Sequence, residues 1–205
     1  MVFFMRCCKR LRPINFSLNQ LVKISALILM FSVWSVASFA ASSSLNVKNA
    51  DLRLDGDSYS LDADVDINFD EDVEEAINKG VVLHFIVEFQ VVSPRKYWFD
   101  DEIVTKTQST TLSYHALTRQ YLLKRDGHQQ SYDTLLEAKL ELAEIRDWKV
   151  LEKSQIEKGE AYRAALLMRL DQTKLPKAIQ VDAIGSEAWA LISQKYEWKP
   201  KELNK

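Results

Sequence analysis

The sequence is poor in the residues that build thiolate, metal and phosphate-binding sites. Its two cysteines, Cys7 and Cys8, both precede residue 41, and its five glycines are scattered singly rather than gathered in a loop. Its three histidines show no metal-ligand spacing, and no G-x-S-x-G or H-E-x-x-H motif occurs. The sequence predicts no cofactor, no metal site and no catalytic constellation of a known type.

The first forty residues differ from the rest and predict export. Five basic residues and no acidic ones precede an apolar run over 24–36, and small residues stand at Ser38 and Ala40. This order is typical of a secretory signal peptide. We expect cleavage after Ala40, which leaves residues 41–205 as a single periplasmic or cell-envelope domain without cysteine.

An uncleaved anchor is the alternative reading of the same segment. Residues 24–41 are eighteen uncharged residues in a row, the lower limit for crossing a bilayer. In either case the basic end stays in the cytoplasm and the remainder is exported. Apart from this N-terminus, the sequence predicts no contact with a membrane.

The charge of the exported part argues against nucleic acid as a partner. Residues 41–205 hold 22 basic and 29 acidic side chains, a net charge of −7. Proteins that bind nucleic acid neutralise phosphates with an excess of Lys and Arg, and this excess is missing.

Hydrophobic periodicity predicts a mostly β fold. Over 59–69, apolar residues alternate with polar ones without a break, which is typical of an antiparallel strand with one buried face. The nearly continuous apolar run over 81–92 predicts a central strand covered on both faces. Further strands are expected over 45–54, twice within 97–124, and over 128–132, 148–151, 161–170, 179–184 and 188–195.

Two short helices interrupt these strands, at about 70–79 and 134–145. Asp70 is placed to cap the first helix and Gly80 to end it, while Thr134 and Glu137 form the capping box of the second. The predicted architecture is therefore a single antiparallel β-sandwich with two short helices.

Three aspartates on the strand over 59–69 suggest calcium at first sight. Asp62, Asp64 and Asp66 recur at every second position, so their side chains stand about 7 Å apart, too far to share one ion. We interpret them as a solvated acidic face.

The richest candidate site combines two neighbouring segments, 94–102 and 112–121. If these pair across a hairpin, guanidinium, phenol and imidazole groups line one patch suited to a carboxylate, phosphate or sugar. Ion pairs to acids such as Asp101 and aromatic residues in the core are the structural alternative, as they are for 146–148. The candidate binding residues are Arg95, Tyr97, Trp98, Asp100, Tyr114, His115, Arg119 and Tyr121.

These segments carry a family resemblance. PRKYWFD, LSYHALTRQY, TLLEA, RDW and RLDQTKLPKAIQVDA, in this order, resemble an exported proteobacterial family known as domain of unknown function 4390. The resemblance runs from about residue 47 to 198. It implies an envelope location and a single domain but no reaction, and it suggests an inner-membrane sensor kinase as a partner.

Three hypotheses about function follow. The first is a non-enzymatic binding or signalling-accessory domain whose face includes Arg95, Tyr114, His115 and Arg119. The second is a small envelope hydrolase or transferase with His115 as general base, beside Ser113 or a tyrosine. The third is a structural interaction module that offers a sheet edge to a membrane partner.

Overall fold

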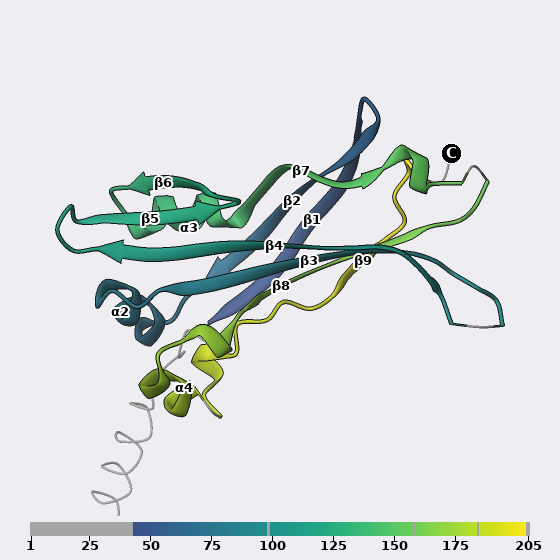
Figure 1. Cartoon of the computed structure of the whole chain (residues 1–205). Coiled ribbons are helices and arrows are strands. Elements are labelled where there is room, and N and C mark those ends of the chain that lie inside the picture. The colour runs from purple at the N-terminus through teal and green to yellow at the C-terminus, as the bar shows by residue number, and fades with distance from the viewer. Residues whose placement is uncertain (1–42, 98, 158, 184, 204–205) are drawn as a thin grey trace, which may run out of the picture. The chain divides into compact units, whose positions relative to one another are not determined.

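Two antiparallel sheets and a few short helices make up the domain (Figure 1). The computed structural model describes residues 43–203 apart from 98, 158 and 184. The expected signal peptide and its cleavage position lie outside the described residues. The sequence prediction of a mostly β sandwich is confirmed.

The smaller sheet has three strands in the order β1-β2-β7. These are β1 (Ser44–Asp55), β2 (Ser58–Asn68) and β7 (Glu144–Glu152). The alternation predicted for β2 holds, because Tyr59, Leu61, Ala63 and Val65 are buried while the aspartates between them reach solvent.

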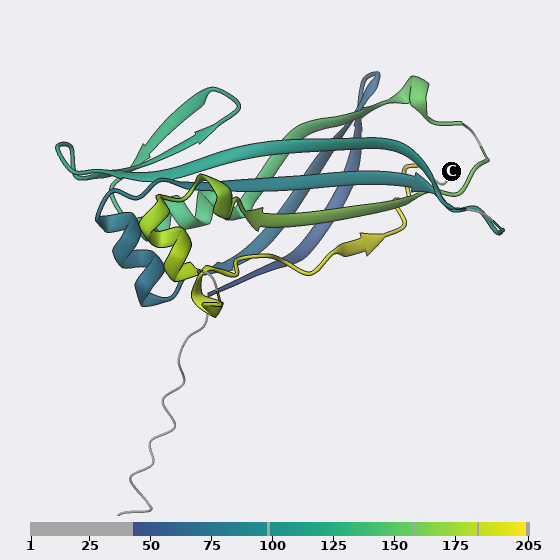
Figure 2. The ribbon, with the colours of Figure 1, turned by 60° about the horizontal axis from the view of Figure 1, so that its bottom comes forward.

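The larger sheet has six strands in the order β6-β5-β4-β3-β8-β9. They are β3 (Leu83–Ser93), β4 (Asp101–His115), β5 (Gln120–Arg125), β6 (His128–Tyr132), β8 (Arg163–Leu170) and β9 (Tyr196–Trp198). Strands β1 and β2 run obliquely across this sheet in both views (Figures 1 and 2).

Both predicted helices form, with the predicted caps. Helix α2 (Glu71–Asn78) begins where the Asp70 carboxylate accepts the backbone N–H of Val73 at 3.0 Å. Helix α3 (Leu135–Ala143) begins at the Thr134–Glu137 capping box and runs directly into β7. Three single 3-10 turns occur at Lys153–Gln155, Gln172–Lys174 and Glu187–Trp189.

Phe89 joins the two sheets in the core. Its side chain on β3 is fully buried, and its ring centroid lies 6.4 Å from that of Trp148 on β7 and 6.2 Å from that of Trp198 on β9. A single aromatic residue thus contacts the small sheet and the C-terminal strand of the large one.

Three sequence predictions are wrong in detail. A strand was expected over 179–184, but 179–183 lie in helix α4 (Lys177–Ala183). This helix begins after Pro176 and turns Ile179 and Ala183, four residues apart, inward. Residues 188–195 contain part of a 3-10 turn and one isolated bridge, at Ile192. Strand β3 buries only one face, because polar residues such as Glu88 occupy the other.

No helix in the described part of the chain is long and apolar enough to cross a membrane.

Replacing Phe89 with Ala is expected to lower the free energy of unfolding by about 3–5 kcal/mol, because the cavity would open where the two sheets meet. Phe99→Ala is the matched control: the Phe99 side chain is 87% exposed. We expect the control to change stability by less than about 0.5 kcal/mol. Urea denaturation followed by tryptophan fluorescence measures both, and equal effects would contradict this description of the core.

Candidate functional site

The structure separates the predicted patch into two groups at opposite ends of β4. Arg95, Tyr97 and Asp100 lie in the loop before the strand, whereas Tyr114 and His115 lie at its far end. A strand of 15 residues is about 45–50 Å long. The two groups therefore do not line one surface. Trp98 lies outside the described residues.

At the first end of β4, Arg95 forms an ion pair with Asp101, which is the structural alternative to a binding site. Its guanidinium pairs with the Asp101 carboxylate, and its backbone N–H donates to Asp100 Oδ1 at 3.3 Å. The Tyr97 ring is 87% exposed, with Lys96 Nζ 5.5 Å from its centroid. These contacts shape the β3–β4 loop.

At the second end of β4, Tyr114 packs on Tyr121 of β5, with ring centroids 5.0 Å apart. The Tyr121 hydroxyl donates to Asn78 Oδ1 at 2.6 Å, and burial raises the pKa of Tyr121. This pair attaches the β4–β5 hairpin to the end of α2.

The turn between β4 and β5 carries His115 and Arg119, both exposed. His115 Nδ1 lies 3.0 Å from the Thr118 hydroxyl, and Arg119 adopts a positive φ of 56°. Within the described residues no carboxylate hydrogen-bonds the His115 ring. The general-base hypothesis therefore gains no support from this geometry and stays a prediction.

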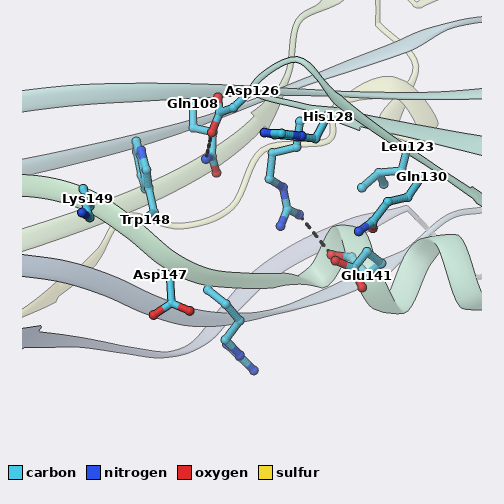
Figure 3. A pocket seen from close by; sticks show the side chains of 11 residues that line it. Gln108, Leu123, Asp126, His128, Gln130, Glu141, Asp147, Trp148 and Lys149 are labelled. Carbon is cyan, nitrogen blue, oxygen red and sulfur yellow. Dashed lines mark hydrogen bonds between the residues drawn. The ribbon is translucent and has the colours of Figure 1, made fainter. Parts of the chain in front are cut away.

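A polar cavity of about 520 Å³ lies elsewhere, between the β4–β6 part of the large sheet and β7 (Figure 3). We call it the β4–β7 cavity. Its lining residues are Gln108, Leu123, Arg125, Asp126, His128, Gln130, Glu141, Arg146, Asp147, Trp148 and Lys149.

Strand parity explains why polar side chains face this cavity. On β4, Gln108 and Thr110 lie in phase with the buried Leu112 and so point between the sheets. The hairpin between β5 and β6 is tight, because Asp126 and Gly127 form a two-residue turn with φ of 47° and 84°. This pair of left-handed residues matches the twist of the strands that it joins.

Arg125 holds the floor of the cavity together. Its Nη1 donates to the Glu144 carbonyl at 2.8 Å, and its Nη2 to the carbonyls of Glu141 and Leu142 at 3.0 and 3.4 Å. Its Nε donates to the Thr110 hydroxyl at 3.3 Å. These acceptors include carbonyls at the C-terminal end of α3, which a cation stabilises. Burial lowers the pKa of Arg125.

The outer wall of the cavity is an ion-pair network. Arg146 pairs with Asp64 and donates to the Ala63 carbonyl at 2.8 Å. Asp147, with a positive φ of 50°, pairs with Arg53. Arg146 and Asp147 thus form structural contacts, one of the two alternatives that the sequence left open for residues 146–148.

Two aspartates of β2, Asp62 and Asp64, belong to the same network, whereas Asp66 forms a separate ion pair. Asp62 accepts the backbone N–H of Asp147 at 2.9 Å, and Asp66 pairs with Lys48 at 3.1 Å. Within the described residues, no group of three or more His, Cys, Asp or Glu side chains is arranged to hold a metal ion.

Gln108 is the unusual residue of the cavity. It is 5% exposed, and its Nε2 donates to the Asp126 carboxylate (Figure 3). Its Oε1 is buried and has no hydrogen-bond partner in the described chain. A buried oxygen left unpaired costs about 1–3 kcal/mol.

The lining is close to neutral in formal charge, and its described residues include no hydroxyl or thiol side chain. Three basic side chains, three acidic ones and one imidazole face the cavity, and no Ser, Thr, Tyr or Cys side chain is among the described lining residues. Lys149 has no ion-pair partner within the described residues. The arrangement offers hydrogen-bond donors and acceptors to a polar ligand.

Sequence reasoning missed the central members of this cavity. Gln108, Arg125, His128 and Lys149 were not among the candidate residues. A signal was present, since Lys106, Gln108 and Thr110 continue the inward phase of Leu112 with polar residues. Polar residues in a buried phase mark an opening between sheets.

The fold and the cavity define a two-sheet β domain with a polar recess between its sheets. The chain belongs to the family described as Domain of unknown function (DUF4390), which matches residues 42–199. The resemblance noted in the sequence is thereby confirmed. No curated protein and no solved structure matches the chain.

Replacing Arg125 with Ala is expected to lower the free energy of unfolding by about 1–3 kcal/mol, because the carbonyls of the α3–β7 junction, two of them in partly buried hydrogen bonds, lose their donors. Arg119→Ala is the control, since that exposed side chain has no partner within the described residues, and we expect less than about 0.5 kcal/mol. Thermal denaturation by circular dichroism measures both. An unchanged Arg125→Ala variant would show that the guanidinium does not secure this junction.

Proposed function

We propose that the protein is an exported, non-enzymatic binding domain that serves as an accessory to an inner-membrane protein such as a sensor kinase. It acts in the periplasm or cell envelope and takes a polar segment of its partner into the β4–β7 cavity. The leader pattern supports the location, and the acidic charge of residues 41–205 argues against nucleic acid as the partner.

The observation that carries the proposal is the unpaired Oε1 of Gln108. Leucine would leave no buried oxygen unpaired and would give up only the hydrogen bond to the exposed Asp126 carboxylate, so the amide brings little net stability. This oxygen is shielded from solvent, so a bound segment reaches it when the Gln108 side chain turns toward the cavity, and an N–H group of the segment then supplies the donor that the described chain lacks. A buried polar group without a hydrogen-bond partner lowers stability, and a ligand that supplies the missing partner is one explanation for such a group.

The charge of the lining indicates what kind of group binds. Its three basic and three acidic side chains balance, and several are held by each other or by backbone carbonyls. A neutral ligand rich in donors and acceptors fits this balance better than an anion or a cation does. The main chain of a polypeptide segment has this chemistry.

Gln108→Leu is expected to abolish partner binding while leaving the free energy of unfolding unchanged or raising it by up to about 1 kcal/mol. Binding is measured in cells that express the full-length gene with a photo-crosslinking amino acid at Gln130, which lines the cavity. We expect an adduct with one inner-membrane protein, identified by mass spectrometry, that disappears in the Gln108→Leu background.

Two controls make this test specific. The same crosslinker at Thr107, exposed on β4 beside the inward-facing Gln108, should give no adduct. Thr110→Val, a buried neighbour on the same strand, should lower stability because Arg125 Nε loses its acceptor. An adduct that forms equally from Thr107, or that persists with Leu at position 108, would refute the proposal.

The location has its own prediction. Protein made from the full-length gene should appear in the periplasmic fraction, and its N-terminal sequence should begin Ala-Ser-Ser, from Ala41, because the small residues at Ser38 and Ala40 direct cleavage. Fractionation and Edman sequencing check this. Membrane-bound protein with an intact leader would favour the anchor, and protein confined to the cytosol would refute export.

A further inference from the structure

The outer edge of β6 is an unprotected strand edge. Strand β6 (His128–Tyr132) pairs with β5 through all five residues without a bulge, and none of the described strands pairs with its other side. Its first four residues are exposed, and none of the five is Asp, Glu, Lys or Arg. Edges of this kind are templates for pairing with another chain.

The pairing pattern shows which backbone groups are free. Arg125 and His128 flank the two-residue turn and form a hydrogen-bonded pair, so Leu123 and Gln130 form the next one. The N–H and C=O groups of Gln129 and Ser131 therefore point away from β5. No backbone hydrogen bond joins either residue to another part of the described chain.

Other edges of the two sheets are protected by charge and irregularity. Strand β1 carries Lys48, Asp51 and Arg53 on exposed positions and shifts register between Val47 and Asn49. Strand β7 shifts register twice against β2, and its exposed residues include the charged Asp147, Lys149 and Glu152.

The remaining free edges follow the same rule. Strand β9 is only three residues long and has Glu197 at its centre. The part of β4 that extends past β5, over 101–109, carries Glu102 and Lys106 and has a register shift near Ile103. Bulges, charges and short length all block edge pairing. Among the described strands, β6 alone is left regular and without a permanent charge.

We propose that β6 pairs antiparallel with β6 of a second copy of this chain, so that two six-stranded sheets join into one. With Gln130 on the two-fold axis, Gln129 of each copy lies opposite Ser131 of the other. These are the residues whose backbone groups point outward, so both form hydrogen-bonded pairs. The register is self-complementary and places no like permanent charges opposite one another.

This pairing closes at two copies and is weak. A two-fold contact uses the same edge in both copies, so none is left to extend the assembly. Five paired residues bury less than the roughly 1,600 Å² of a standard stable interface, so we expect weak self-association, with a dissociation constant on the order of 100 µM. Because Gln130 also lines the β4–β7 cavity, the two cavities open on the same face of the joined sheet. Pairing itself does not depend on the proposed ligand.

Sedimentation equilibrium of the purified protein, produced from its full-length gene, tests the pairing between about 10 µM and 1 mM. The wild-type protein should pass from monomer to dimer. Gln129→Pro removes an outward N–H while sparing the bonds to β5, so its dimerisation should weaken at least about tenfold. Gln129→Thr, which keeps the N–H, is the matched control and should dimerise like the wild type.

A second pair of variants guards against misfolding by proline. Gln129→Lys with Ser131→Lys adds charge to the β6 edge and should also prevent dimerisation. Thr107→Lys with Ser109→Lys adds the same charge to exposed positions of β4 and should not. A wild-type protein that stays monomeric at 1 mM, a species larger than a dimer, or wild-type self-association in either β6 variant would overturn the proposal.

Discussion

The guanidinium of Arg125 is the contact on which the candidate site depends. It extends from the last residue of β5 and binds carbonyls of the α3–β7 junction, so it fixes one sheet to the start of the other. A charged group in this position needs several acceptors because burial disfavours it. Once they are satisfied, the space beside Arg125 stays open and polar instead of collapsing into the hydrophobic core.

Sequence patterns predicted well those elements whose formation depends on interactions between neighbouring residues. The alternation of β2, the Asp70 cap and the Thr134 capping box each depend on a few neighbouring residues, and each was found as predicted. The strand expected over 179–184 failed because a short apolar run does not distinguish a strand from a helix turned inward at Ile179 and Ala183.

The site was harder to predict than the fold because it depends on register and strand length. Arg95 and His115 are close in the sequence, yet the length of β4 holds them at opposite ends of the sheet. Conversely, Gln108 and Lys149 face one cavity from strands of different sheets. No pattern within one strand reveals how strands from two sheets face each other.

The backbone segments around the β4–β7 cavity are joined by very short connections. Asp126 and Gly127 close one wall in a two-residue turn, and α3 passes into β7 without a connecting loop. Backbone that is already fixed has little conformational entropy left to lose when a ligand binds. Preorganisation of this kind lets a modest number of polar contacts give useful affinity, and it favours ligands that match the existing shape over ligands that require the protein to rearrange.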